Sequence, residues 1–149
     1  MELPTLLVIV NCVASLFMVG LIWMVQIAHY PLFSEVGEEN FVAFHKRHQT
    51  LTTLVVGPPM LIEALSSGLL FWYPPAGVNH WLISVGIGLV FLIWFSTAAI
   101  QLPCHGKLVD GFDQATHRRL VRSNWIRTVA WTARGILTIW MLVCLSSVA

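Results

Sequence analysis

The chain has 149 residues, of which 57% are hydrophobic and 10% are charged, and its formal net charge at pH 7 is +1. With a mean hydropathy of +0.78, this composition excludes an ordinary soluble domain, in which about 25% of residues are charged. The near-neutral charge gives no support to a nucleic-acid partner. The lipid bilayer is the partner that the composition favours.

Four apolar runs account for the high hydropathy, and they occupy residues 5–28, 49–73, 81–102 and 125–147. Each is long enough to cross the hydrocarbon core of a bilayer, which takes about 20 helical residues. The first run is too long for the apolar part of a cleaved signal peptide and has no Lys or Arg before it, so we expect it to remain in the mature protein. The sequence predicts an all-α fold, a single four-transmembrane-helix bundle over residues 1–149.

The basic residues outside these runs predict the topology. Lys and Arg occur there only in residues 30–48 and 103–124, and the other three flanking segments have none. By the positive-inside rule, both segments are cytoplasmic and both termini lie outside. We therefore expect a multi-pass protein of the inner (cytoplasmic) membrane.

The two cytoplasmic segments resemble each other at an offset of 72 residues. The matches are Pro31 with Pro103, His45 with His117, and Lys46-Arg47 with Arg118-Arg119. This agreement in spacing and residue type favours a duplication, in which two tandem helical hairpins of about residues 1–74 and 75–149 share one orientation. The alternative is coincidence between two loops that both need prolines and cations.

Polar residues follow one stripe of the last helix. At heptad spacing this stripe contains His117, Leu120, Asn124, Arg127, Trp131, Arg134, Thr138 and Met141. Because arginine is costly on the lipid side of a helix, we expect the stripe to face the bundle interior. The second helix repeats the pattern, next to Glu63 and with prolines that should kink it, at His45, His48, Thr52, Val55, Pro59, Ile62 and Ser66.

The inward arginines have two interpretations. Arg127 and Arg134 could hold an anionic or carbonyl substrate through the fork-shaped guanidinium, with Asn124 and Glu63 completing a substrate-binding set. The alternative, which we favour for Arg134, is a structural ion pair with Glu63. Tyr30 could donate to a ligand, but its place near the headgroups is more typical of an interfacial tyrosine.

Five of the six histidines are predicted to share the cytoplasmic rim. They are His29, His45, His48, His105 and His117. Histidine is the commonest metal ligand, so the set could bind copper, iron or a haem. The repeat would let His45 and His117 face each other as ligands. The alternative is that these histidines accompany Lys and Arg at the headgroups and bind nothing.

The stretches QIAHYPLF, FHKRH, QLPCHGKLVDGFD and NWIRTVAWTARG resemble a family of small bacterial integral membrane proteins without an assigned function. The resemblance covers nearly the whole chain and is most specific in LPCH…GFD…NWIRT. More distantly, the chain is similar in architecture and loop placement to the small four-helix membrane proteins grouped with anthrone oxygenases, which act on polycyclic aromatic substrates. This second resemblance implies a lipophilic substrate and no particular catalytic residue.

Two functions of different class follow from the sequence. The first is a metal- or haem-dependent, redox or oxygenase-like membrane enzyme that acts on a lipophilic small molecule. The second is a non-catalytic accessory subunit or small-molecule carrier, as a homo- or hetero-oligomer. Hydrolase and nucleotide-binding functions have no support, because the chain has no nucleophile elbow, phosphate loop, HExxH pattern or CxxC pair.

Overall fold

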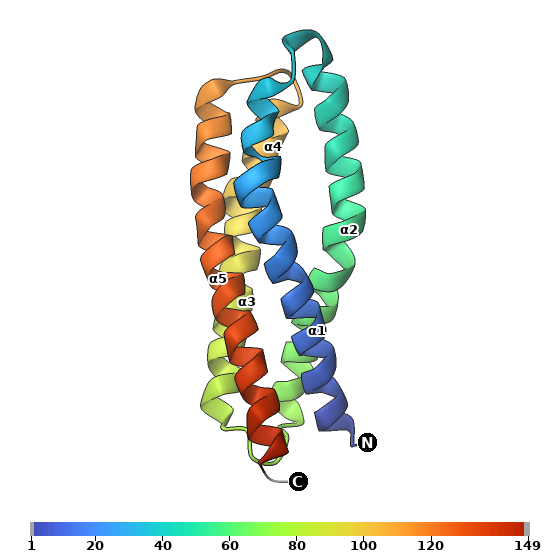
Figure 1. The fold of residues 1–149 in the computed structure, drawn as a ribbon, viewed down its shortest axis with the longest axis vertical. Coiled ribbons are helices and arrows are strands. Elements are labelled where there is room, and N and C mark those ends of the chain that lie inside the picture. The colour runs from blue at the N-terminus through green and yellow to red at the C-terminus, as the bar shows by residue number, and fades with distance from the viewer. Residues whose placement is uncertain (1, 148–149) are drawn as a thin grey trace.

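A computed structural model of the chain describes residues 2–147. These residues form helices and short connections, with no strand in the described range. In chain order (Figure 1) the elements are α1 (Leu3–Met24), the π-helix η1 (Val25–His29), the 3₁₀-helix η2 (Pro31–Glu35), α2 (Glu38–Trp72), α3 (His80–Ser96), the π-helix η3 (Thr97–Gln101), α4 (Leu102–Leu108) and α5 (Gln114–Ser146).

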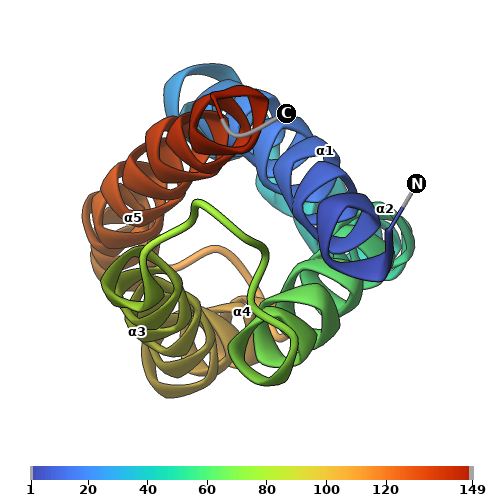
Figure 2. The ribbon, with the colours of Figure 1, turned by 90° about the horizontal axis from the view of Figure 1, so that it is seen from below.

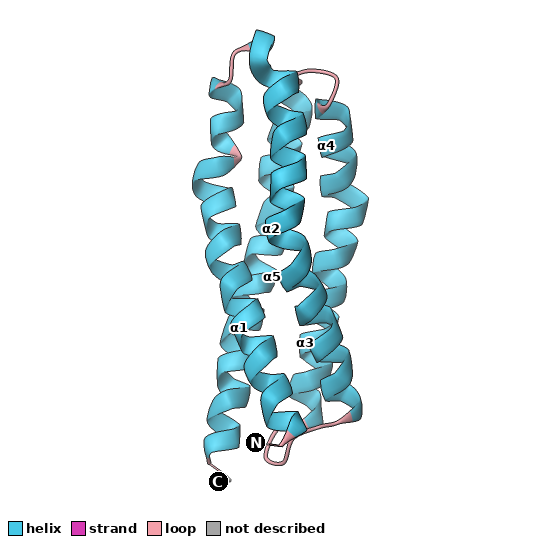
Figure 3. Cartoon of the chain, turned by 90° about the vertical axis from the view of Figure 1, so that its right-hand side faces the viewer, coloured by secondary structure: helices cyan, strands magenta, loops and turns pink. Residues whose placement is uncertain are grey.

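The long helices form a ring in which each runs antiparallel to its neighbours. Seen from the end, the order around the ring is α1, α2, α3 and α5, and α4 continues the line of α3 (Figure 2). The connections between them are short and lie at the two ends of the bundle (Figure 3). This arrangement confirms the predicted four-helix bundle. Both termini lie at one end, and we call the opposite end, which contains residues 29–48 and 102–117, the histidine end.

Four helical spans are long and apolar enough to cross a membrane: Leu3–Glu35, Glu38–Trp72, His80–Leu108 and Gln114–Ser146. They contain 29 to 35 residues, which corresponds to about 44 to 52 Å of helix at 1.5 Å per residue. The hydrocarbon core of a bilayer is only about 30 Å thick. One or both ends of the bundle must therefore extend to the headgroups or beyond them.

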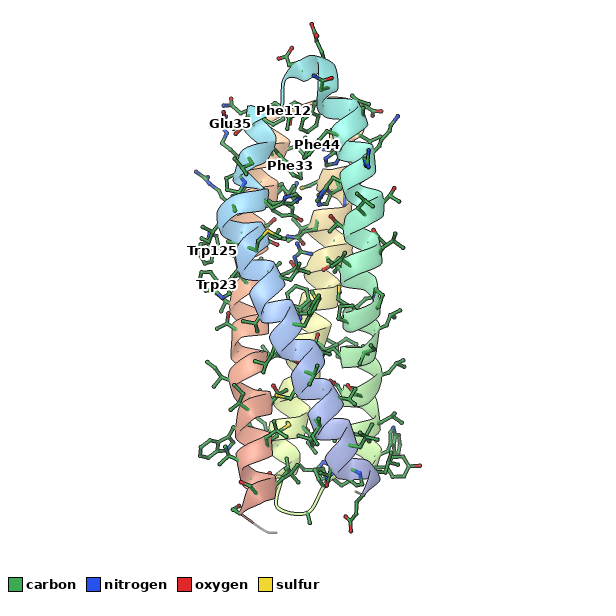
Figure 4. The ribbon with its side chains drawn as sticks, turned by 45° about the vertical axis from the view of Figure 1, so that its right-hand side comes forward. Trp23, Phe33, Glu35, Phe44, Phe112 and Trp125 are labelled. Carbon is green, nitrogen blue, oxygen red and sulfur yellow. The ribbon has the colours of Figure 1, made fainter. Side chains whose placement is uncertain are left out.

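Exposed tryptophans lie at several levels along the bundle, and they include Trp94 and Trp140 at 38% and 57% exposure. Trp72 and Trp81, at the end that holds the termini, are 76% and 70% exposed. Trp23 and Trp125 meet edge to face on the outer surface of α1 and α5, with ring centroids 5.6 Å apart (Figure 4). Tryptophan is enriched at membrane interfaces, so these exposed rings are typical of helices that cross a bilayer.

The stripe predicted on the last helix is confirmed over its whole length. All of its residues are buried in α5. Its two arginines, Arg127 and Arg134, are 7% and 1% exposed. Asp113 caps this helix by accepting a hydrogen bond from the Thr116 N–H at 2.7 Å, which satisfies one of the free donors of the first turn.

The stripe predicted on α2 is right at His45, His48 and Ser66, which are buried, and wrong at Val55 and Ile62, which are exposed. Glu63, which is 1% exposed, lies 18 residues and therefore about five turns from His45, and it shares the inward face with it. Ile62 lies on the outer surface of the bundle.

α2 continues as a helix through Pro58 and Pro59. Proline has no N–H, so the carbonyls of Leu54 and Val55, four residues earlier, lose their usual helical donors. The helix changes direction in the half that contains the prolines (Figure 1). Proline is the usual cause of such a bend.

An ion pair between Glu63 and Arg134 holds the middle of the bundle together. Arg134 Nε donates to Glu63 Oε1 at 2.7 Å, and both side chains are 1% exposed. The carboxylate also accepts hydrogen bonds from Ser15 and Trp131. The remaining guanidinium nitrogens donate to the Gly86 carbonyl, Asn11 Oδ1 and Ser67 Oγ. The predicted pair is confirmed, and its network joins all four long helices.

Candidate functional site

Four imidazoles meet inside the histidine end. They come from three elements: His29 from η1, His45 and His48 from α2, and His105 from α4. The ring centroids of four contacting pairs are 4.7 to 5.9 Å apart. His29 Nε2 and His48 Nδ1 are 2.8 Å apart, and His45 Nε2 and His105 Nδ1 are 3.4 Å apart. The structure thus brings together four of the five predicted rim histidines, which we call the imidazole cluster.

Two π-helical turns, η1 and η3, lead into the segments that form the histidine end. η1 begins at Val25 and η3 begins at Thr97, the same offset of 72 at which the two cytoplasmic segments match. A π turn adds one residue to a helix and rotates everything that follows, and such turns occur frequently at functional sites. In the first half this turn ends on His29, a member of the cluster. In the second half it ends on Gln101, which is buried and donates to Ser123.

Tyr30 links the imidazole cluster to Arg127. Its hydroxyl lies 3.2 Å from Arg127 Nη2 and 3.0 Å from His105 Nε2. His45 Nε2 lies 3.4 Å from His105 Nδ1 and 3.2 Å from the His105 carbonyl oxygen. All of these contacts are hydrogen bonds if His45 and His105 both carry their proton on Nε2, which is an assignment from the network of donors and acceptors.

This protonation state has two consequences. The Tyr30 oxygen accepts one hydrogen bond from Arg127 and one from His105, so its own proton is free for a third partner. His45 Nδ1 is left with a bare lone pair, and it is the one buried side-chain nitrogen or oxygen in residues 2–147 without a hydrogen-bond partner. In this protonation state a free donor and a free acceptor remain at the site.

His117 lies apart from the imidazole cluster. Its Nε2 donates to the Tyr30 carbonyl at 2.7 Å, and its ring stacks on Phe33 with centroids 6.2 Å apart. Phe33 is fully buried and also contacts His45 and His48, with centroids 5.6 and 4.9 Å away. Figure 4 shows Phe33 among the side chains near this end, close to Phe44 and Phe112. His117 fixes the backbone at Tyr30, and the face-to-face arrangement with His45 is not present.

A cavity of about 710 Å³ adjoins the cluster. At the histidine end its wall includes His48, His105, Tyr30 and Arg127. Of the predicted substrate-binding residues, Arg127 lines the cavity, whereas Asn124, Glu63 and Arg134 do not. Asn124 instead positions the guanidinium, because its Oδ1 accepts from Arg127 Nε at 3.0 Å.

Sequence reasoning misjudged Tyr30 and overlooked Phe33. Tyr30 is buried, with 4% exposure, rather than interfacial. Its hydroxyl is within hydrogen-bond distance of both His105 and Arg127. The available signal was the position of Tyr30 between His29 and Pro31, because a proline interrupts the hydrogen bonds of a helix. Within residues 2–147, no group of three or more His, Cys, Asp or Glu side chains is arranged so that it could hold a metal ion.

No protein-family model, no curated protein and no solved structure matches this chain. The geometry of the histidine end and of its cavity is therefore the basis on which a function can be argued.

Proposed function

We propose that this is an enzyme of the inner membrane that binds a redox-active metal ion at the imidazole cluster and acts on a lipophilic substrate in the adjoining cavity. The observation that carries the proposal is the convergence of four imidazoles from three segments, two of which, His48 and His105, line one cavity. Its volume lies in the range of about 300 to 1,000 Å³ that is typical of small-molecule sites.

The spacing within two pairs of ring nitrogens supports a metal site, which the structure reaches only with some movement of the side chains. Two nitrogens bound to one ion at about 2.0 to 2.1 Å lie about 3.3 Å apart in tetrahedral geometry. The 3.4 Å between His45 Nε2 and His105 Nδ1 matches this value, and the 2.8 Å between His29 Nε2 and His48 Nδ1 has to open slightly. Binding through His45 Nε2 requires its proton to move to Nδ1, because neutral imidazole binds metal through its unprotonated nitrogen.

Copper and iron fit better than haem. Imidazole suits both ions. A haem held by two imidazoles places its macrocycle between them, whereas the rings of the cluster are in contact with one another. The ion would supply one-electron chemistry. The chain's own contribution is to hold the substrate with Arg127 and Tyr30 and to exclude water with the buried Phe33 and Phe41.

The proposal includes the orientation and the origin of the bundle. The exposed cations of residues 30–48 and 103–124 support a cytoplasmic histidine end, with both termini outside. The two π turns at an offset of 72 residues support a duplication of one helical hairpin. In that case the two halves diverged at the site, because His29 corresponds to Gln101 and Phe33 corresponds to His105.

Elemental analysis and an absorption spectrum of the detergent-purified protein test the metal. We expect stoichiometric copper or iron in the wild type, and its loss in His48→Ala and in His105→Ala. His80→Ala is the matched control, because His80 is exposed at the opposite end of the bundle. His117→Ala should also keep the metal, because its ring lies outside the cluster.

A wild-type protein that takes up no copper or iron after loading would contradict this proposal. Equal metal content in His48→Ala and in the His80→Ala control would contradict it too, because the ion would then be bound elsewhere. The remaining hypothesis would be a membrane carrier or accessory subunit that uses the cavity without a metal.

A further inference from the structure

The cavity has a polar end and an apolar end. This order matches the polar head and apolar tail of a lipid that lies in one leaflet. Along α2 its wall extends from His48 to Leu61, which is about 20 Å at 1.5 Å per residue. The polar side chains of Tyr30 and Arg127 lie at the end near His48. Met60 and Leu61 line the other end, toward the middle of the bundle. A bound amphiphile would place its head at the histidine end and its tail toward the bilayer midplane.

One side of the cavity opens on the apolar outer surface of the bundle. Leu54 and Leu61 of α2 and Leu102 of α4 line it, and these side chains are 67%, 53% and 61% exposed. α2 packs closely on α1 and touches α4 at few positions. Farther down, a second cavity of about 410 Å³ lies between α2 and α3. A ligand can therefore enter sideways from the membrane without crossing the polar loops.

Arg127 is a buried cation without a carboxylate partner in the described part of the chain. The one ion pair within residues 2–147 is that of Arg134 and Glu63. Arg127 bonds to the neutral groups Asn124 and Tyr30, and its Nη1 has only a long contact of 3.4 Å with the Thr97 hydroxyl. A buried charge is stable only when it is paired or well hydrogen-bonded. The cavity thus offers one positive charge with a free N–H.

The Tyr30 hydroxyl is a second donor beside this guanidinium. Its oxygen lies 3.2 Å from Arg127 Nη2, and its proton is free in the protonation state described above. Arg127 Nη1 and the Tyr30 hydroxyl are two neighbouring donors on the wall of one cavity. Two such donors match the two oxygens of a carboxylate.

We propose that the cavity binds a long-chain carboxylate, whose head pairs with Arg127 and Tyr30 and whose tail extends along α2 toward Leu61. The proposal rests on the proposed function in that it fills the same substrate cavity, but it requires no metal. A phosphomonoester is a poorer match, because it carries about 1.5 to 2 negative charges against one guanidinium.

Binding of radiolabelled palmitate to the protein in phosphatidylcholine nanodiscs tests the inference. Hexadecanol has the same tail with a neutral head, and hexadecyl phosphate has the alternative anionic head. The variants are Arg127→Gln, Arg127→Lys as one that keeps the charge, and Arg122→Gln as the matched control. Arg122 is an exposed arginine of the same helix. Each measurement is made with and without a chelator, so that a missing metal does not affect the result.

We expect saturable binding in which palmitate exceeds hexadecanol by about 10-fold to 100-fold, the range for one charge-assisted interaction. Arg127→Gln should abolish this preference and keep hexadecanol binding, which also reports that the cavity is folded. Arg127→Lys should keep part of the preference, and Arg122→Gln should keep all of it. The same result with chelator would support the carboxylate site even if the metal proposal fails.

Three outcomes would overturn the inference. Equal binding of palmitate and hexadecanol would show that the protein does not recognise the negative charge of the head group. An unchanged preference in Arg127→Gln would place the recognising charge elsewhere. Tighter binding of hexadecyl phosphate than of palmitate would identify a phosphorylated lipid as the ligand in place of a carboxylate.

Discussion

Arg127 and Arg134 lie two turns apart on the same stripe of α5 but have different partners. Arg134 is enclosed by a carboxylate, a backbone carbonyl and side-chain oxygens. Arg127 has a neutral amide and a phenol, and it faces a cavity. At the scale of the residue, Arg134 has the fully paired environment of a structural ion pair, whereas Arg127 has the environment of a group that binds a ligand.

The buried ion pair gives a prediction at this scale. Glu63→Gln and Arg134→Gln should each lower the free energy of unfolding in detergent by about 3 to 5 kcal/mol, because each leaves an uncompensated buried charge. The double variant should lose less than the sum of the two single losses. Arg122→Gln, which removes an exposed charge from the same helix, is the control and should have little effect. Single losses as small as that of the control would mean that the pair does not hold the bundle.

At the scale of the element, α1 and α5 are in close contact at Gly135. A Cβ added there would lie 2.9 Å from Val19 Cγ2, so Gly135→Ala should lower stability by about 1 to 3 kcal/mol through overpacking. Gly20 provides the control on α1, because nothing lies within 4 Å of its added Cβ. Gly20→Ala should be neutral or stabilise the helix by up to about 1 kcal/mol. Thermal unfolding of both variants checks the prediction, and equal melting temperatures would contradict it.

The π turn before the cluster gives a second prediction for an element. Deleting Ala28 converts η1 to an ordinary α-turn and rotates the residues after it by about 100°. His29 and Tyr30 would then leave their partners His48 and Arg127. Thermal stability should fall well below that of Ala28→Gly, which keeps the register and costs about 1 kcal/mol. If the deletion were no worse than this substitution, the π turn would not be what positions the site.

At the scale of the whole molecule, the orientation in the membrane can be measured directly. We expect alkaline phosphatase fused after residue 147 to be active and a green fluorescent protein fused there to be dark, because the C-terminus is predicted to lie outside. The same reporters inserted between Asp110 and Gly111 should show the reverse. A fluorescent C-terminal fusion would reverse the orientation and place the histidine end outside.

The outline of the fold could be read from the sequence, because hydropathy and charge act on whole helices. The stripe on α5 was predicted correctly because each of its arginines makes the lipid side costly. The stripe on α2 was predicted less well, since the mild preferences of Val55 and Ile62 leave the helical phase undetermined. The partner of Arg134 was predictable because Glu63 is the one acidic residue within the apolar runs.

The candidate site was predicted only in part. Polarity at one end of the bundle indicated which histidines could meet, and four of them do. The separation of His117 depends on the ring of Phe33, whose position is set by the η1 and η2 turns rather than by any regular spacing. The cavity exists because α2 and α4 make few contacts. Amino-acid composition does not indicate how closely two helices pack.

A bend at the paired prolines of α2 would move the part of this helix that lines the cavity. His48 lies nine residues from Gly57, about 14 Å along the helix axis, so a tilt of about 5° at the prolines would move its ring by about 1 Å. His45 and His48 lie on this part of α2, whereas His29 belongs to η1 and His105 to α4. A ligand tail packed against Leu54 would therefore change the distances from the ring nitrogens of α2 to those of His29 and His105. A ligand that tilts this part of α2 would then also change the geometry of the imidazoles.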